Sequence, residues 1–261
     1  MLRRRSHKQI RPDEEVQAVR EACVVAATVL DKLCQMVEVG VTTYDIDQAG
    51  KRLLASMDAD SACFNYQVGN RIYPAYTCLS VNDEVVHGIG KLETVLNDGD
   101  NVTVDVCVQY NGFIGDNART VIVGQGSESM ERLVEKTRKA LELGIAQARA
   151  GNRVGDISSA IQQYVQQSGY SVVREFVGHG VGRTMHEDPQ IPNYGRPKSG
   201  AKLFPGMTLA IEPMVLEGGA AISIDDDGWT ARTRDGKPAA HFEHTVLVTE
   251  DEPEILTIPK K

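Results

Sequence analysis

The stretch Asn101-Val-Thr-Val-Asp-Val-Cys-Val-Gln-Tyr-Asn-Gly-Phe-Ile-Gly-Asp-Asn-Ala-Arg-Thr-Val-Ile-Val123 carries the clearest structural pattern in the chain. Runs rich in β-branched residues flank Asn111-Gly112, and this dipeptide favours the two-residue turn of a β-hairpin. A turn of that length pairs Tyr110 with Phe113. We therefore expect two long antiparallel strands in this part of the chain.

The same register decides where two acidic side chains point. Asp105 faces Ala118 and Asp116 faces Cys107, so the aspartates are diagonal neighbours on one face, about 7 Å apart at the backbone. Both carboxylates can then reach one cation. A loop longer by one residue would remove this arrangement, because side chains alternate between the two faces of a strand.

Further acids stand in apolar strands of the second half of the chain. Glu212 follows Leu209-Ala-Ile, and Glu243 lies within the predicted strand 240–248. A buried carboxylate without a partner is costly, so each of these acids, like Asp105, needs a cation or a hydrogen-bond network. His179 lies between two glycines, which favours a backbone that passes close to a ligand or takes a positive φ.

Four carboxylates and one imidazole suit a pair of divalent cations, because carboxylate oxygens can bridge two ions and the four negative charges balance them. A hydroxide held between the ions would be a nucleophile at neutral pH. The sequence therefore predicts metal-assisted hydrolysis. The predicted metal ligands are Asp105, Asp116, His179, Glu212 and Glu243.

Composition limits the class of protein. Hydrophobic residues make up 41% and charged residues 25% of the 261 residues, which is typical of a soluble enzyme. A net charge of −8 argues against a long nucleic-acid surface. The five cysteines include no CxxC pair, which argues against a disulfide framework and a structural zinc module. No apolar stretch follows the basic start of the chain, so we expect a cytoplasmic protein without a secretory signal or a membrane span.

The two halves of the chain share a sequence pattern. A helix is expected from Pro12 to about Gly40, and a second one, capped by Ser127, runs toward Gly151. Gly40 and Gly151 are 111 residues apart, and the same offset relates Asp45-Ile46 to Asp156-Ile157. We expect an α+β fold with a basic tail (1–11) and one catalytic domain (12–261), built from similar halves at about 12–123 and 127–250.

Six motifs together resemble one known family, the type I methionine aminopeptidases, whose fold is called pita bread. They are NDEVVHGIG (82–90), GDNVTVDV (99–106), GFIGDNART (112–120), GHGVGRTMHEDPQ (178–190), TLAIEPM (208–214) and HFEHT (241–245). The resemblance extends from Ile10 to the C-terminus. It implies a central antiparallel sheet flanked by helices, with the five residues named above as ligands of two metal ions.

The resemblance also implies the reaction, which is removal of the initiator methionine from nascent proteins, with a preference for a small second residue. Glu212 would carry the proton, His186 would stabilise the oxyanion, and His87 would hold the scissile nitrogen. The side chains that would contact substrate are His87, His186, Cys63, Tyr66, Tyr73, Cys78, Met185 and Trp229. The metals would be manganese, iron, cobalt or zinc.

Two features depart from the family pattern at the rim of the site. Residues 67–72 form a longer loop than many relatives carry, and Met185 stands where an aromatic residue is usual. A basic cluster near the N-terminus, Arg3, Arg4, Arg5 and Lys8, is read either as a solvated terminus or as a transient contact to the ribosome. A monomer is expected.

Three other readings share this fold. Xaa-Pro dipeptidases and aminopeptidases carry an extra N-terminal domain, for which no room precedes His87. Type II methionine aminopeptidases carry a helical insertion between His186 and Glu243, where this chain has only strand and turn patterns. A catalytically inactive binding protein would have lost ligands, and here all five are present.

Overall fold

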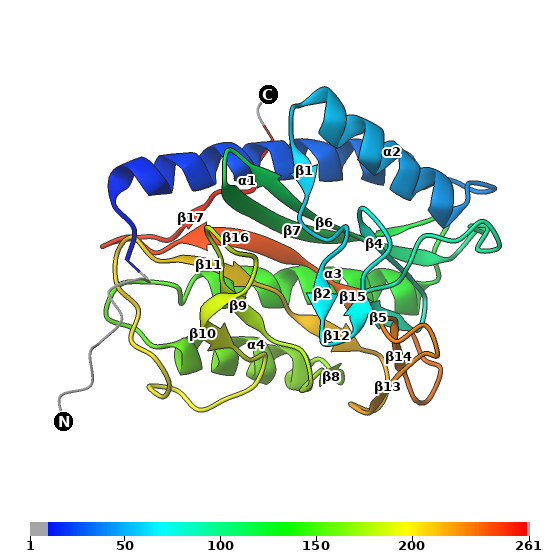
Figure 1. Cartoon of the computed structure of the whole chain (residues 1–261). Helices are drawn as coiled ribbons and strands as arrows, with labels where there is room; N and C mark the ends of the chain where they lie inside the picture. Colours follow the sequence, from blue (N-terminus) through cyan, green and yellow to red (C-terminus); the bar gives the residue numbers. More distant parts are fainter. Residues whose placement is uncertain (1–9, 260–261) are drawn as a thin grey trace.

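The computed structural model describes residues 10–259 and has a mixed α+β fold built around one large antiparallel sheet (Figure 1). The sheet has nine strands, in the order β1-β6-β7-β16-β11-β9-β10, with β4 paired to β6 and β17 paired to β16. The predicted fold class is confirmed. The strands are β1 (Asp60–Ser61), β4 (Cys78–Val81), β6 (Asn101–Tyr110), β7 (Phe113–Ile122), β9 (Gly178–Gly180), β10 (Glu187–Ile191), β11 (Thr208–Ile211), β16 (Glu243–Leu247) and β17 (Glu254–Ile255).

The β6–β7 hairpin has the predicted register. Tyr110 pairs with Phe113 across the turn, and the register continues without a shift to the pair Asn101 and Ile122. Both turn residues take a positive φ, 50° at Asn111 and 79° at Gly112. This conformation matches the right-handed twist of the strands, and asparagine and glycine tolerate it.

The two faces of β6 have different chemistry because side chains alternate along a strand. Val102, Val104, Val106 and Val108 belong to the hydrophobic core beneath α1 (Asp13–Cys34) and α2 (Thr43–Ser56). Asp105 and Cys107 point to the opposite face and line a cavity. The sheet therefore has one face packed on helices and one face that carries polar chemistry.

Within residues 10–259, four helices cover the packed face, two for each half of the chain (Figure 1). In the second half, α3 (Glu128–Ile145) and α4 (Val154–Gln167) share a core with residues of β11 and β16. Ser127 caps α3 by accepting a hydrogen bond from the amide of Met130 at 3.2 Å, as predicted. Helix α1 ends at Cys34, earlier than the predicted end near Gly40, because a tight turn begins there, with Met36 N donating to Leu33 O.

Smaller sheets surround the central one. They contain β15 (Ala239–His241), β12 (Met214–Leu216) and β8 (Ser171–Val172) in one, β13 (Ile222–Ile224), β14 (Ala231–Thr233) and β5 (Glu84–Val86) in another, and β2 (Gln67–Val68) with β3 (Arg71–Ile72) in a third. The predicted 67–72 loop is thus a short hairpin. Its residues Val68 and Ile72 are exposed.

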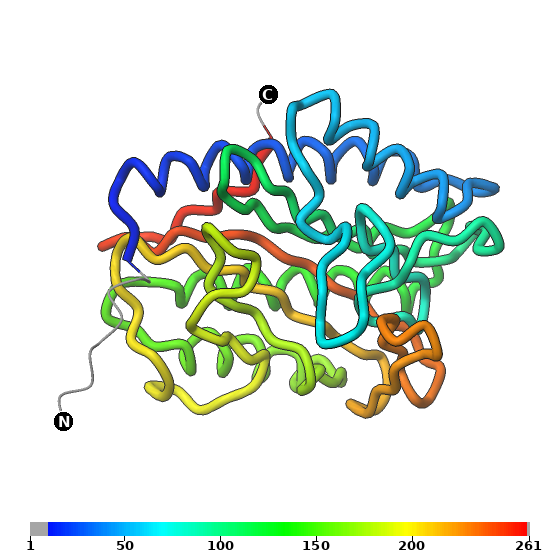
Figure 2. Tube along the Cα trace, viewed as in Figure 1, coloured from blue at the N-terminus to red at the C-terminus, as the bar shows by residue number. Residues whose placement is uncertain are grey.

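The first helix and the last strand lie side by side (Figure 2), joined by an ion pair in which Arg20 donates to Glu254. Arg11, the last residue of the predicted basic tail, is only 7% exposed. Its guanidinium donates to Thr208 Oγ1 at 2.8 Å and to the carbonyl of Val181 at 3.0 Å. Within residues 10–259, no helix has the length and hydropathy of a membrane span.

Candidate metal centre

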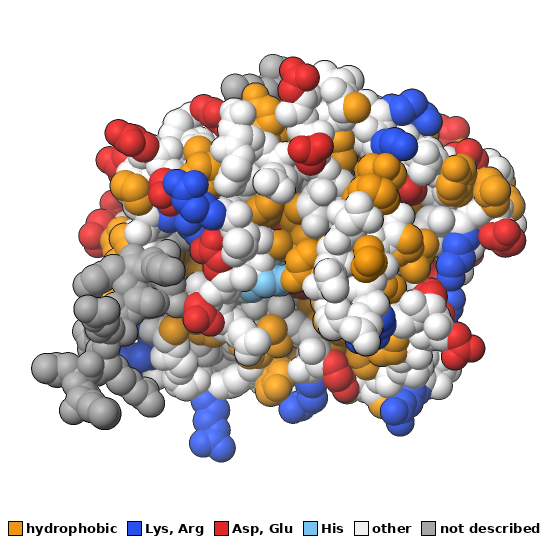
Figure 3. Space-filling view, in the orientation of Figure 1, with side chains coloured by type: hydrophobic (Ala, Val, Ile, Leu, Met, Phe, Trp, Pro, Cys, Tyr) orange, Lys and Arg blue, Asp and Glu red, His pale blue; other side chains and the backbone are white. Residues whose placement is uncertain are grey.

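A cavity of about 250 Å³ opens on the polar face of the central sheet. Figure 3 shows this face with a hollow near its centre, where histidine surface is visible between hydrophobic side chains. The cavity brings together all the predicted site residues from both halves of the chain. They are Cys63, Tyr66, Tyr73, Cys78, His87, Asp105, Asp116, His179, Met185, His186, Glu212, Trp229 and Glu243.

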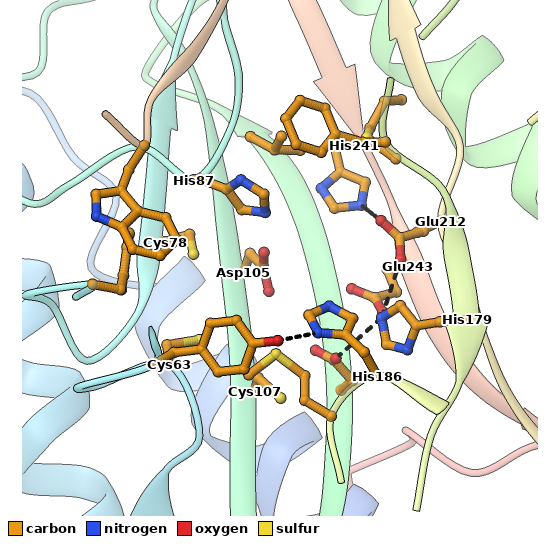
Figure 4. Close-up of a pocket in the computed structure, with 18 of the residues that line it drawn as sticks. Cys63, Cys78, His87, Asp105, Cys107, His179, His186, Glu212, His241 and Glu243 are labelled. Atoms are coloured by element: carbon orange, nitrogen blue, oxygen red, sulfur yellow. Dashed lines mark hydrogen bonds and ion pairs between the residues drawn. The ribbon is translucent and has the colours of Figure 1, made fainter. Parts of the chain in front are cut away.

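Three of the five predicted ligands form a compact buried group. Asp116, His179 and Glu243 each place one ligand atom within 4.8 Å of the others, and the Nε2 atom of His179 lies 3.9 Å from Asp116 Oδ2. The same nitrogen is 3.4 Å from Oε1 of Glu212. Asp105 lies on the same face of the hairpin as Asp116 and lines the same cavity (Figure 4).

The acids of this group repel one another. Burial, followed by the charge of Asp116, raises the pKa of Asp105 and of Glu212 well above the ordinary values. Burial likewise raises the pKa of Asp116 to about 7 and that of Glu243 well above its usual range. Glu243 Oε1 is buried with no hydrogen-bond partner in the described chain. A buried oxygen without a partner, crowded by three further carboxylates, fits divalent cations, which would supply the missing positive charge.

His179 is prepared to act as a neutral nitrogen donor. Its Nδ1–H donates to the carbonyl of Gly180 at 3.0 Å, which leaves the lone pair of Nε2 directed at the carboxylates. Burial lowers the pKa of His179 to about 4, so the ring is neutral at physiological pH.

The glycines beside His179 serve a purpose that differs from the predicted one. A Cβ at Gly178 would lie 2.5 Å from the carbonyl oxygen of Ala210, and one at Gly180 would lie 2.3 Å from that of Asp188. The backbone at these two positions passes close to the neighbouring strands β11 and β10, and neither glycine has a positive φ. The glycines therefore let three strands pack closely around the imidazole.

His186 stands at the open side of the cavity, where Tyr66 and His179 flank its ring. Its Nδ1 is 2.6 Å from the hydroxyl of Tyr66, and the two imidazole rings meet edge to face at 4.5 Å. Partial removal from water lowers the pKa of His186. If the Tyr66 hydroxyl donates to Nδ1, the proton of the neutral ring is on Nε2.

Glu187, the residue after His186, stabilises the loop that carries His186 through hydrogen bonds. Glu187 Oε1 accepts hydrogen bonds from the backbone amides of Arg183 at 2.9 Å and Thr184 at 3.1 Å. Its other oxygen accepts from the guanidinium of Arg11. The loop is therefore tied to the segment just before α1, which lies far away in the sequence.

The wall next to Asp105 is made of thiols and aromatic rings. Tyr73 packs edge to face against Trp229 at 5.3 Å, and its hydroxyl donates to Gly88 O at 2.8 Å. Contacts among the thiols, together with burial, raise the pKa of Cys63 and Cys78 well above the ordinary value. The thiols therefore remain neutral, and this part of the wall is soft and weakly polar.

His87 occupies a strained position on the same side of the cavity. Its backbone has a φ of 62°, which is uncommon for a residue with a Cβ. Its ring packs against Phe176 at 5.0 Å, and burial lowers its pKa to about 4. The neutral ring faces the cavity (Figure 4).

The two predicted departures both lie at the rim. Val68 of the β2–β3 hairpin and Met185 line the cavity. Arg71 of the same hairpin lies over the ring of Trp229, with 5.7 Å between its guanidinium carbon and the ring centroid, and donates to the carbonyl of Gly228. The hairpin is thus fastened to the wall that carries Trp229. The predicted basic cluster at Arg3, Arg4, Arg5 and Lys8 lies outside the described residues.

Besides the apolar Val86, Phe176 and Val177, sequence reasoning missed three side chains that line the cavity and carry sulfur or an imidazole, namely Cys107, Met214 and His241. Each of these three stands two positions from a predicted ligand, but only Cys107 shares a strand (β6) with that ligand, so strand alternation could have revealed only Cys107. His244, next to Glu243 in the chain, is not part of the cavity lining, and its Nδ1 lies 2.8 Å from the hydroxyl of Thr257.

Comparison with known proteins agrees with this geometry. Residues 17–250 match the model of metallopeptidase family M24. The methionine aminopeptidase of Clostridium acetobutylicum is 43% identical over 249 residues, which cover 95% of this chain and 98% of that protein. Methionine aminopeptidase 1 of Bacillus subtilis is 43% identical over 243 residues, 93% of this chain and 96% of that one.

Solved structures show the same likeness. The methionine aminopeptidase of Thermotoga maritima superposes with a TM-score of 0.91 at 44% identity, covering 95% of this chain and 98% of that one. A prolidase of Pyrococcus horikoshii shares the fold, with a TM-score of 0.77 at 20% identity, but this chain covers only 65% of it. The chain therefore belongs to metallopeptidase family M24 and, within that family, to the methionine aminopeptidases.

Proposed function

We propose that this protein removes the N-terminal methionine from peptides and nascent proteins whose second residue is small, and that it uses two divalent cations. The observation that carries this proposal is the buried group of Asp116, His179 and Glu243, joined on the same cavity by Asp105 and Glu212. The likeness to methionine aminopeptidases along nearly the whole chain supports it.

The five residues would hold the cations, with carboxylate oxygens as the main donors and the free Nε2 of His179 as the nitrogen donor. When bound, the cations would polarise the scissile carbonyl and lower the pKa of water, so that a nucleophile is available at neutral pH. Manganese, iron, cobalt and zinc all accept such donors.

Proton transfer is assigned to Glu212. Its Oε1 lies 3.4 Å from His179 Nε2, so the carboxylate borders the place where water would attack. We propose that Glu212 takes a proton from that water and returns it to the leaving amine. General acid–base catalysis of this kind contributes a factor of about 10²–10⁴ to the rate.

His186 and His87 are assigned to the substrate. With Tyr66 donating to Nδ1, the Nε2–H of His186 is free to donate to the carbonyl oxygen as negative charge develops there. His87 faces the cavity as a neutral ring and would hold the nitrogen of the bond that breaks. Asp105 would meet the free amino group, which restricts cleavage to the first residue.

The side-chain pocket for methionine would be the wall of Cys63, Cys78, Tyr73 and Trp229. Neutral thiols and aromatic edges make favourable contacts with a thioether. Tyr66 and Met185 would close the pocket at its rim, together with the 67–72 hairpin. A bulky second residue would meet this rim, which is consistent with the proposed preference for small ones.

The experiment is hydrolysis of a Met-Ala-Ser peptide by the purified protein. We expect activity to disappear with a chelator and to return on addition of manganese, iron, cobalt or zinc. Glu212→Gln should remove activity while circular dichroism shows a retained fold. No turnover with any of these metals would overturn the proposed function, and turnover by Glu212→Gln would overturn the assignment of the proton carrier.

We further propose that the protein acts as a cytoplasmic monomer on chains that emerge from the ribosome, with Arg3, Arg4, Arg5 and Lys8 as the ribosome contact. The charge of this cluster supports the proposal, since ribosomal RNA is polyanionic. Cosedimentation with ribosomes should be lost when the four residues are replaced by alanine. Equal cosedimentation of the two proteins would overturn this contact.

A further inference from the structure

His241 is a buried histidine in the wall of the metal cavity whose ring has no assigned partner. It is 2% exposed and lines the cavity, yet neither Nδ1 nor Nε2 has a hydrogen-bond partner among residues 10–259. Buried polar groups in folded proteins are nearly always satisfied. Two unpaired ring nitrogens inside a site therefore indicate a hydrogen bond that forms when the site holds its metal ions.

The backbone holds this ring in a fixed place. His241 N donates to Thr120 Oγ1 at 2.8 Å, and the same hydroxyl lies 2.9 Å from His241 O. His241 also pairs with Met214 across β12 and β15. Met214 stands two residues after Glu212, so this pairing places His241 close to Glu212.

The nearest charged group to the ring is Glu212. Nε2 of His241 is 3.9 Å from Glu212 Oε2, while the other oxygen of the same carboxylate faces His179 at 3.4 Å. Glu212 thus lies between two imidazoles, as Figure 4 shows. A shift of about 0.7 Å would bring His241 to the outer limit of a hydrogen bond, about 3.2 Å.

We propose that His241 is a positioning residue, whose neutral imidazole donates from Nε2 to Oε2 of Glu212 when divalent cations occupy the centre. The bond would fix the rotation of the carboxylate, so that Oε1 faces the cations and the attacking water. Partners of this kind around metal ligands orient the ligand, and their loss typically costs 10–100-fold in metal affinity or activity. The effect on kcat and KM rests on the proposed function, whereas the effect on metal binding does not.

Two polar substitutions separate the hydrogen bond from simple filling of space. His241→Gln places an amide N–H near the former Nε2, whereas His241→Asn reaches only the former Nδ1 position. His244→Gln is the matched control, because His244 lies three residues further along the chain and is not part of the cavity lining. We would measure manganese binding to the metal-free proteins by calorimetry, and kcat and KM on the Met-Ala-Ser peptide.

We expect His241→Asn to weaken manganese binding and to lower kcat by about 10-fold or more, with KM changed less than about twofold. His241→Gln and His244→Gln should stay within about threefold of the wild type. Equal behaviour of the Asn and Gln variants, or wild-type binding by His241→Asn, would overturn the proposal. If the wild type fails to cleave the peptide, the proposed function fails, and calorimetry alone still decides the role of His241.

Discussion

Replacing Asp116 with asparagine is expected to stabilise the metal-free protein near neutral pH. Asp116 is 5% exposed, and burial raises the pKa of its carboxyl from 3.8 to about 7. One pKa unit corresponds to about 1.4 kcal/mol, so keeping this carboxyl ionised in the folded state costs about 4 kcal/mol. Asparagine has nearly the same shape and no charge, so Asp116→Asn removes this cost.

The stabilisation by Asp116→Asn depends on pH, and its direction follows from the raised pKa of Asp116. The folded pKa lies above the unfolded one, so between the two values the folded state binds more protons and the free energy of unfolding falls as pH rises. The cost is absent below 3.8 and complete above about 7. The advantage of Asp116→Asn should therefore be close to zero at about pH 4 and about 4 kcal/mol at about pH 8.

The assay is urea unfolding followed by circular dichroism in the presence of a chelator. Wild type and variant are compared at each pH, because burial also lowers the pKa of His87, His179 and His241, which destabilises the fold as pH falls below 6.5. The difference between the two proteins cancels that effect. Asp251→Asn, at an exposed position, should change nothing. A variant no more stable than wild type at about pH 8 would refute the reasoning.

Added metal should reverse which of the two proteins, wild type or Asp116→Asn, is the more stable. A ligand that binds only the folded state stabilises it by about 4 kcal/mol at a concentration 1,000 times its dissociation constant. Asp116→Asn loses one proposed ligand and should gain less from added manganese. The variant is then expected to be the more stable protein with chelator and the less stable one with manganese.

Three further substitutions test how the fold supports the site. Gly115→Ala should lower the free energy of unfolding by about 1–3 kcal/mol in thermal denaturation. The added Cβ would lie 2.5 Å from the backbone of Ala22 in α1, so unchanged stability would contradict this close contact. Glu187→Gln should lower kcat/KM about 10-fold or more by loosening the His186 loop, and wild-type kinetics would argue against that role. Cys78→Ser should lower kcat/KM for methionine relative to alanine at the first position by about 10-fold; an unchanged ratio would place the methionine pocket elsewhere.

The hairpin could be predicted from the sequence because its information is local. Asn111-Gly112 sets the turn, the turn sets the register, and the register puts Asp105 and Asp116 on one face. The acids on apolar strands could be recognised for a similar reason, since a carboxylate in such a strand is costly without a partner. In both cases a few neighbouring residues carry the signal.

Contacts between distant segments could not be predicted in this way. Arg11 and Glu187 are separated by 176 residues, and no local pattern relates them. His241 was overlooked for another reason, because the chain leaves its strand at Phe242 between β15 and β16, and alternation across such a break is not assured. The close approach at Gly178 and Gly180 depends on neighbouring strands that the glycines themselves do not identify.

The segments His87-Gly-Ile-Gly and His179-Gly-Val-Gly are similar in sequence, but they lie at different positions in the fold. His179 lies in β9, which pairs with β11, whereas the strand that pairs with β6 in the other half is β4, and it places Cys78 opposite Asp105. His87 follows β5, outside the central sheet. Similar segments therefore reach the cavity from different strands.

Because the two halves contribute different strands to the cavity, the two sides of the cavity carry different side chains. In the strand order β4-β6-β7-β16-β11-β9, the first strand brings the thiol of Cys78 to the cavity and the last strand brings the imidazole of His179. An imidazole at Cys78 would add a second nitrogen donor beside Asp105 and remove a soft wall. The thiol instead leaves room for an apolar side chain next to the proposed ligands. In the proposed reaction, the peptide bond can lie over the acids only if the first side chain of the substrate has such a place, so the asymmetry between the halves supports the proposed selectivity for methionine.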